Sequence, residues 1–162
     1  MVESPAQGGW VIALSFALAF LFTVLPIPTG LMWARPEWVS LVLIYWVIAL
    51  PQRVGVMSAF FAGLLLDALE GSMLGQNALA LSVVAYLALI LYQRLRQFNM
   101  MQQAAVVFVL VGIDQIVSAW VQNIDGASPR GVLILMPVLM SALLWPAVMT
   151  SLRHSRRRFS VS

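Results

Sequence analysis

Six apolar blocks make up most of this chain, and they restrict its fold more than any other feature. The blocks cover roughly residues 10–25, 38–50, 54–66, 78–92, 104–121 and 132–152, and polar or proline-rich breaks separate them. A helix that crosses the hydrocarbon core of a bilayer needs about 20 residues. Of the 162 residues, 62% are hydrophobic and 9% are charged, whereas a soluble domain has about 25% charged residues. The sequence therefore predicts an all-α integral membrane protein, a compact bundle of about six transmembrane helices.

The second and third blocks are shorter than a full membrane crossing. Only Pro51, Gln52 and Arg53 lie between them, which predicts a tight turn between antiparallel helices. Either both helices recruit flanking residues, or one is partly re-entrant, which membranes tolerate only where protein covers the backbone. The second alternative would lower the count to about four or five spans.

The chain is predicted to form one domain. Residues 1–152 make up a single transmembrane domain, and residues 153–162 a basic cytoplasmic tail. No break between the blocks approaches the roughly 40 residues that an unaided domain needs. The first block is preceded by Glu3 and by no Arg or Lys, and it lacks a small-residue cleavage site. We therefore expect a retained helix rather than a signal peptide.

The arginines predict the orientation. With six crossings and a cytoplasmic N-terminus, seven arginines fall in cytoplasmic segments and two in outer loops. The seven are Arg53, Arg94, Arg96, Arg153, Arg156, Arg157 and Arg158, and the two are Arg35 and Arg130. Because positive charge collects on the cytoplasmic side, we expect both termini in the cytoplasm. The tail is then a topology-fixing flank, although it could also attract anionic lipid or touch a cytoplasmic protein.

Aromatic residues lie at or near the ends of the blocks. They are Trp10, Trp33, Trp38, Tyr45, Trp46, Tyr92, Trp120 and Trp145. Tryptophan and tyrosine are enriched at the membrane–water interface, so we expect these rings to act as anchors there.

A stripe of small residues that includes one aspartate runs along the third block. Its members, at spacing four, are Gly55, Ala59, Gly63, Asp67 and Gly71. Residues at this spacing share one helix face, and small side chains let another backbone approach closely. The stripe either packs against this chain's own helices or docks a helix of another protein. We take the stripe, together with Arg53 and Gly75, as the candidate partner-binding set.

Asp67 itself lies toward the outer end of the third block. A carboxylate that faces lipid costs about 2.5–3.5 kcal/mol. We therefore expect Asp67 to face protein or water, with Arg35 or Arg130 as a potential ion-pair partner.

Asp114 is the second unusual carboxylate, near the middle of the fifth block. Gln115, Ser118 and Gln122 extend it into a polar strip. The strip could be a proton or substrate path, or it could hydrogen-bond neighbouring helices, which is worth about 0.6–2 kcal/mol per contact. The second alternative is favoured, because a transport relay needs several ionisable groups on several helices.

No catalytic set or metal site is recognisable. The chain has no cysteine and a single histidine, His154, which excludes thiolate and histidine-pair ligands. A Gly-rich phosphate loop, an HExxH helix and a G-x-S-x-G elbow are also missing. Asp67 and Asp114 are expected at different depths, which argues against an aspartyl protease. We expect no enzyme activity, no metal and no cofactor.

A series of short segments then points to a family. The segments are residues 35–39, 44–46, 49–55, 63–67, 71–75 and 81–86, the linker 92–96, the aspartate at 114 and residues 144–146. In this order and spacing they resemble the MreD family of bacterial rod shape-determining membrane proteins. The match covers nearly the whole chain, and residues 35–96 are its most specific part.

The resemblance implies an inner-membrane protein that works with MreC, which has one membrane helix and a large periplasmic part. It also implies indirect partners, namely the actin homologue MreB, the glycosyltransferase RodA and its penicillin-binding transpeptidase. MreD-like proteins are similar to the S-components of energy-coupling-factor vitamin transporters, which are compact six-helix proteins. The residues that match the family motif, and that we expect at the partner contact, are Arg53, Gly63, Asp67 and Gly71 with the loop 75–77.

Two functions fit these observations. The first is a non-catalytic scaffold of the cell-elongation machinery that binds MreC and helps regulate peptidoglycan synthesis and rod shape. The second is a small-molecule or lipid-binding membrane protein of the S-component type, with a polar cavity near Asp67, Asp114 and Gln115. A scaffold requires an exposed, helix-sized groove lined by small residues, whereas a binder requires an enclosed polar pocket of some hundreds of Å³. The few membrane carboxylates argue against a third alternative, a proton-coupled transporter.

Overall fold

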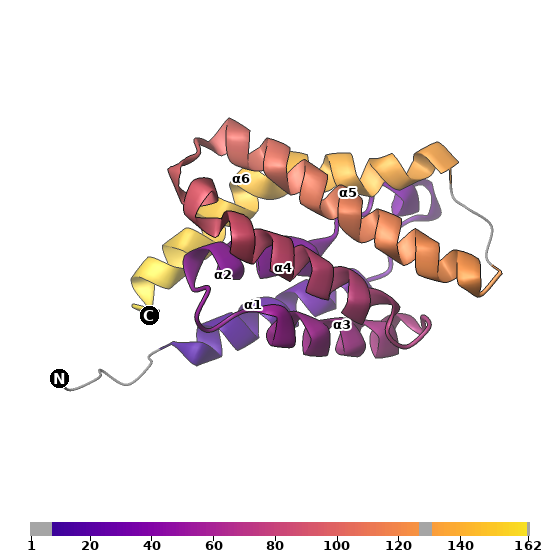
Figure 1. Ribbon diagram of the computed structural model, residues 1–162, viewed down its shortest axis with the longest axis horizontal. Helices are drawn as coiled ribbons and strands as arrows, with labels where there is room; N and C mark the ends of the chain where they lie inside the picture. The colour runs from indigo at the N-terminus through magenta and orange to yellow at the C-terminus, as the bar shows by residue number, and fades with distance from the viewer. Residues whose placement is uncertain (1–7, 127–130, 162) are drawn as a thin grey trace.

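The described part of the chain folds into six α-helices and two short 3-10 helices (Figure 1). A computed structural model describes residues 8–126 and 131–161, without the side chain of Trp33. The helices are α1 (Gly9–Val24), η1 (Thr29–Ala34), α2 (Trp38–Ala49), α3 (Val56–Glu70), α4 (Gln76–Gln97), α5 (Met100–Ile124), η2 (Gly131–Ile134) and α6 (Leu135–Arg158). The described ranges contain no strand. Each apolar block corresponds to one α-helix, so the prediction of an all-helical membrane protein is confirmed.

Three of these helices are long and apolar enough to cross a membrane. They are α4, α5, and α6 together with η2. The other helices are shorter: α1 has 16 residues, α2 has 12 and α3 has 15. At 1.5 Å per residue α2 is only about 18 Å long, which is less than the roughly 30 Å of the hydrocarbon core.

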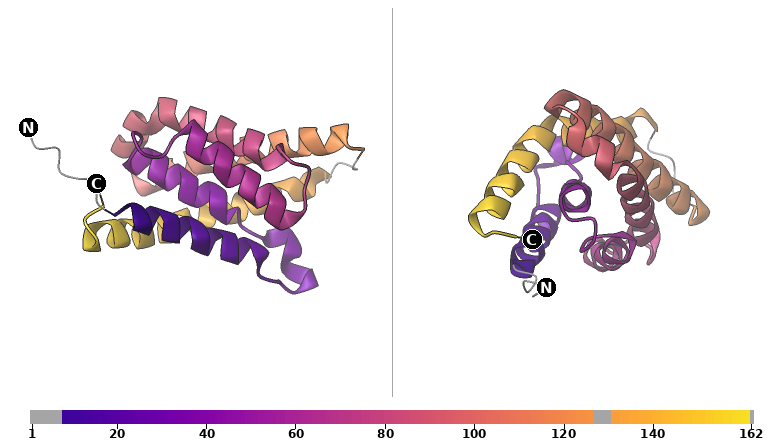
Figure 2. Two further views of the ribbon diagram at one scale, coloured as in Figure 1. Left: turned by 90° about the horizontal axis from the view of Figure 1, so that it is seen from below. Right: turned by 60° about the vertical axis from the view of Figure 1, so that its left-hand side comes forward.

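The short helix α2 is the centre of the molecule. Every residue from Val39 to Ala49 is buried, including Trp46 with no exposed surface. Helices α1, α4, α5 and α6 surround it (Figure 2). The Trp46 indole N–H donates to Ser15 Oγ of α1 at 2.7 Å. Because protein covers its whole backbone, a helix this short is compatible with a membrane.

Successive helices run in opposite directions and divide the polar segments between two ends (Figure 1). We call the end that holds the start of α1, the end of α6 and the turns 50–55 and 98–99 the terminal end. The opposite end holds segments 25–37 and 71–75. At the terminal end Trp10 and Phe159 meet edge to face with 4.8 Å between ring centroids. The first and last described residues thus lie at the same end of the molecule. The assignment of this end to the cytoplasm stays a prediction.

The basic tail is not a separate segment. Arg153 and Arg156–Arg158 continue the helical backbone of α6, and Val161 is buried beside Gly8. A Cβ atom at Gly8 would lie 2.7 Å from Val161 Cγ2, and this glycine has φ +84°. The segment therefore has a fixed position against the start of α1.

Three of the expected interfacial anchors are core residues instead. Trp46 and Trp145 have no exposed surface and Tyr45 is 4% exposed, so the anchor prediction is wrong for all three. Each indole N–H has an internal partner, Ser15 Oγ for Trp46 and Gln103 Oε1 for Trp145, which offsets the cost of burying it. Trp10 and Trp120 are more than half exposed, as an anchor requires.

Candidate functional site

Asp67 joins the end of α3 to the start of α4. The side chain is fully buried, and its carboxylate accepts hydrogen bonds from Ser72 Oγ at 2.8 Å and from the backbone N–H groups of Gly75 and Asn77 at 2.9 Å. The last two donors belong to the first turn of α4, where unpaired N–H groups and the helix dipole favour an anion. Asp67 therefore stabilises this helix junction.

The pairing of Asp67 with Arg35 is not observed. Arg35 instead donates to the carbonyl oxygens of Phe22 and Leu25 at 3.3 and 3.4 Å. Asp67 obtains its donors from the backbone close to it in sequence, and for this reason the Arg35 alternative is wrong. Arg130, the other alternative, lies outside the described residues.

The small-residue stripe of α3 packs inside the chain. Ala59 has no exposed surface, and a Cβ atom at Gly63 would overlap the backbone of Ala78 in α4. At Gly55 a Cβ atom would lie 3.7 Å from Leu89 Cδ1, an ordinary contact. The structure thus realises the first of the two alternatives, packing against the chain's own helices. A role of the stripe in partner binding stays a prediction, and it would have to act through the packing of α3 on α4.

Gly71 and Gly75 bracket the turn between these helices. Both have positive φ, +66° and +100°, which favours glycine because it has no Cβ atom. Their conformations place the Gly75 N–H where Asp67 accepts it. Like Asp67, these glycines shape the junction.

A second polar network links α2 to α5 and α6. Ser40 Oγ donates to Asp114 Oδ2 at 2.8 Å, and Gln115 Nε2 donates to Glu37 Oε1 at 2.7 Å. The Glu37 backbone N–H donates to Ser141 Oγ at 2.9 Å. Asp114 is 3% exposed. These contacts match the expected interhelical hydrogen bonding of Asp114 and Gln115.

Sequence reasoning missed three members of this network. They are Glu37, Ser40 and Ser141. A signal was present in the two serines, since Ser40 interrupts the apolar helix α2 and Ser141 interrupts the apolar first part of α6, residues 135–149. Ser118, which the sequence placed in the polar strip, is buried on the same helix as Asp114.

The predicted polar cavity gains no support from these contacts. Asp67 is hydrogen-bonded within the α3–α4 junction, and Asp114 and Gln115 are hydrogen-bonded to residues of or next to α2. Their polar atoms are largely occupied by protein groups. Among the buried polar atoms of these three side chains, Asp114 Oδ1 is the exception and has no hydrogen-bond partner among the described residues.

An apolar groove of about 430 Å³ separates α1 from α3. We call it the α1/α3 groove. Its lining residues are Gly9, Ile12, Ala13, Phe16, Phe20, Arg53, Val54, Ser58, Phe61, Ala62 and Leu65. Four of them are small, namely Gly9, Ala13, Ser58 and Ala62, and Arg53 is the one member of the candidate partner-binding set. Phe61 on its rim is 62% exposed, so this face would contact lipid or another helix.

A smaller groove of about 330 Å³, which we call the α1/α6 groove, lies on the other side of α1, against α6. It is also apolar, and Ala19, Val42, Ala147 and Leu152 are among its lining residues. Helix α1 is therefore bordered by two apolar grooves, of which the α1/α3 groove is the larger. The described residues hold no cluster of three or more His, Cys, Asp or Glu side chains that could bind a metal ion.

Comparisons with known proteins identify the family of this chain. A family model described as "rod shape-determining protein MreD" matches residues 4–155. The rod shape-determining protein MreD of Haemophilus influenzae is 33% identical over 150 residues, which cover 92% of this chain and 93% of that protein. No solved structure gives a significant match, so the similarity to S-components stays a prediction. The chain belongs to the MreD family of rod shape-determining membrane proteins.

Proposed function

We propose that this protein is a non-catalytic scaffold of the cell-elongation machinery in the inner membrane, with both termini in the cytoplasm. It binds MreC and thereby helps regulate peptidoglycan synthesis and rod shape. Its interactions with MreB, RodA and the penicillin-binding transpeptidase are indirect. Membership of a rod shape-determining family supports the role in cell shape. The name of that family refers to a shape-determining role and to no reaction.

The α1/α3 groove is the observation that carries this proposal. It is open to the lipid phase, and small residues from both helices line it. Small residues let the backbone of an incoming helix approach closely, and van der Waals packing then drives association in lipid. Because α1 and α3 pack mainly on α2 and α4, a helix could enter between them without unpacking the core. The single membrane helix of MreC is the occupant that we propose.

The short loops support an interface within the bilayer. The turn from α2 to α3 covers residues 50–55, the turn from α4 to α5 covers 98–99, and even the connection from α1 to α2, which includes η1, covers only residues 25–37. Segments of this length offer little area, whereas a stable protein interface needs about 800 Å² on each partner. Helix faces supply most of the surface through which this protein can bind.

Single-cysteine cross-linking tests this placement directly. The chain contains no cysteine, so one introduced thiol reacts without background. Ala62→Cys lies in the α1/α3 groove, and its matched control Ala147→Cys lies in the α1/α6 groove. We expect a disulfide between Ala62→Cys and cysteines scanned along the MreC membrane helix, and none with Ala147→Cys.

The other outcomes are equally informative. Cross-links at Ala147→Cys alone would move the interface to the α1/α6 groove. Absence of cross-links at both sites, with MreC still captured, would refute helix docking at α1 and favour the outer loops.

A further inference from the structure

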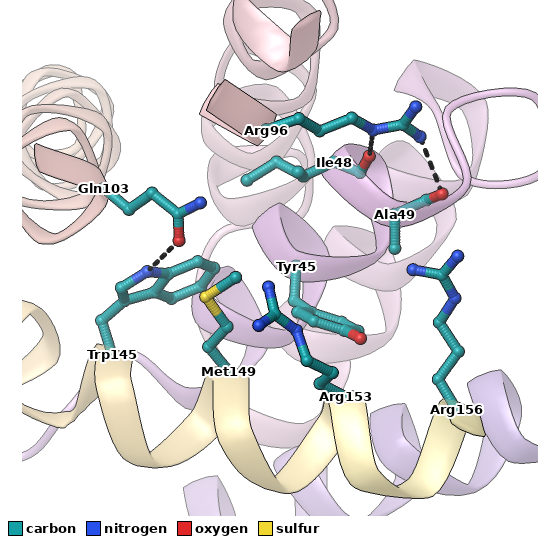
Figure 3. Close-up of a pocket in the computed structure, with 9 residues that line it drawn as sticks. All are labelled: Tyr45, Ile48, Ala49, Arg96, Gln103, Trp145, Met149, Arg153 and Arg156. Atoms are coloured by element: carbon teal, nitrogen blue, oxygen red, sulfur yellow. Dashed lines mark hydrogen bonds between the residues drawn. The ribbon is translucent and has the colours of Figure 1, made fainter. Parts of the chain in front are cut away.

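An arginine-lined pocket opens at the terminal end, and neither the family relationship nor the proposed scaffold role accounts for it. The pocket has a volume of about 310 Å³ and is lined by Tyr45, Ile48, Ala49, Arg96, Gln103, Trp145, Met149, Arg153 and Arg156 (Figure 3). Three of the nine side chains are guanidinium groups, from α4 and α6. A second hollow, of about 520 Å³, shares Arg153 and Arg156 and adds Arg157. We call this region the arginine pocket.

We propose that the arginine pocket binds a phosphate group, either in the headgroup of an anionic phospholipid or as a free anion. Guanidinium groups match the geometry of phosphate oxygens and bind them through paired hydrogen bonds. Basic pockets between membrane helices at the cytoplasmic boundary are suited to anionic headgroups. The walls formed by Ile48, Trp145 and Met149 are compatible with the apolar part of a lipid.

Arg96 is held in place for this role. Its Nε and Nη2 atoms donate to the carbonyl oxygens of Ile48 and Ala49 at 2.8 and 2.9 Å. These carbonyls end α2 and would otherwise lack partners. A guanidinium has more N–H donors than these two bonds use. The side chain is thus positioned with donors to spare, at a small cost in entropy when a ligand binds.

Tyr45 provides an independent observation that points to a ligand in this pocket. The residue is 4% exposed, and its buried hydroxyl forms no hydrogen bond of ordinary geometry with a described residue, although the Arg156 guanidinium lies within reach of it. Arg153, Arg156 and Arg157 lie close enough to act on it electrostatically, and the ring lies between Arg96 and α6 in the pocket (Figure 3). A buried hydroxyl without a partner is costly. A phosphate oxygen in the pocket would satisfy it.

The charge around the pocket is uncompensated within the described ranges. Their five carboxylates are Glu37, Asp67, Glu70, Asp114 and Asp125, which lie at the opposite end or within α5. Glu3 and the C-terminal carboxylate lie outside the described residues, and a variant that starts at Gly8 checks for a contribution from Glu3. Anion binding would reduce the repulsion among the clustered guanidinium groups.

The test uses the full chain purified in an uncharged detergent and titrated with three probes, measured by native mass spectrometry. The probes are dihexanoyl-phosphatidylglycerol, the net-neutral dihexanoyl-phosphatidylcholine and inorganic phosphate. We expect the phosphatidylglycerol to bind more tightly than the phosphatidylcholine. Competition by inorganic phosphate would assign the site to the phosphate group alone, whereas binding of the lipid without such competition would assign it to the lipid headgroup.

Matched variants distinguish binding in the arginine pocket from nonspecific attraction to surface charge. Arg153→Gln with Arg156→Gln should weaken binding about tenfold or more. Arg94→Gln with Arg158→Gln removes the same charge from exposed positions at the same end and should change binding by less than about threefold. Equal losses in the two double variants would overturn the proposal, as would failure of both anionic probes to bind.

Tyr45→Phe gives the sharpest readout because it removes only the unpartnered hydroxyl. It should leave the melting temperature of the unliganded protein unchanged or raise it, since a buried group without a partner is lost. Affinity for the anionic probe should nevertheless fall about tenfold. Unchanged affinity in a folded Tyr45→Phe protein would show that the hydroxyl faces no ligand and would overturn the assignment.

Discussion

The backbones of Gly63 in α3 and Ala78 in α4 touch, and a Cβ atom at Gly63 has no room. This contact brings the small-residue face of α3 against the start of α4, where Asp67 accepts three of its hydrogen bonds. The close approach of the two helices and the buried carboxylate are therefore parts of one junction. Small residues at such a crossing let van der Waals contacts form along both backbones.

Gly63→Ala should destabilise the protein, because the added methyl group must push α3 away from α4. Overpacking of this kind costs about 1–3 kcal/mol or more, which would appear as a lower melting temperature in detergent. Gly112→Ala is the matched control, since its Cβ atom would meet Val138 Cγ1 only at 3.9 Å. Equal melting temperatures for the two variants would contradict the tight contact.

Asp67→Asn should also destabilise the fold. The amide group places donors among the N–H groups of Gly75 and Asn77, and hydrogen bonds to a charged acceptor are worth about 1.5–3 kcal/mol each. Asp125→Asn, at an exposed acid after α5, serves as the control and should melt like the parent. A small effect at Asp67 would mean that its carboxylate does not stabilise the junction.

Asp67→Ala tests the consequence of this junction in the cell. We expect the variant to insert into the membrane but to impair assembly with MreC or rod shape, because α3 would no longer be held in register with α4. Cell shape and MreC recovery are scored at matched protein levels. Normal shape together with full recovery would remove Asp67 from the functional residues.

Ser40→Ala should lower the stability of the protein and so measure how much the buried network contributes to it. It removes the one donor to Asp114 Oδ2 among the described residues and leaves the carboxyl group without compensation. A double-mutant cycle with Asp114→Ala should give a coupling of about 0.6–1.7 kcal/mol. Ser82→Ala is the control, because the Ser82 hydroxyl bonds only within its own helix, to Ala78 O. A coupling near zero would contradict a structural role for the pair.

Ala62→Leu should fill the α1/α3 groove and reduce MreC capture severalfold, while the melting temperature stays near that of the parent. The side chain at position 62 is half-buried at the groove, so the larger residue extends into open space. Ala147→Leu makes the same change in the α1/α6 groove and should leave capture intact. The opposite pattern would place the partner on the other side of α1.

The positions of the helices could be predicted from the sequence, because burial in lipid requires long apolar runs. The apolar block 38–50 has nearly the same bounds as α2, whereas α4 continues past its apolar block to Gln97. Polar residues such as Gln93 and Arg94 continue a helix as well as apolar ones do. The hydrophobicity of the sequence therefore predicts only the apolar part of a helix.

The partners of individual side chains could not be predicted. Spacing showed that Gly63 and Asp67 share a face, but it cannot tell which helix covers that face. Glu37 and Ser141 lie 104 residues apart and meet only because α2 is central. The α1/α3 groove likewise depends on how two helices diverge, which no single block encodes.

The most direct test of the scaffold account is a detergent pull-down against full-length MreC and against MreC lacking its membrane helix. We predict capture of the full-length protein only, with a severalfold reduction of capture in Ala62→Leu and none in Ala147→Leu. Equal capture of both MreC forms would contradict docking within the bilayer and place the interface on the outer loops.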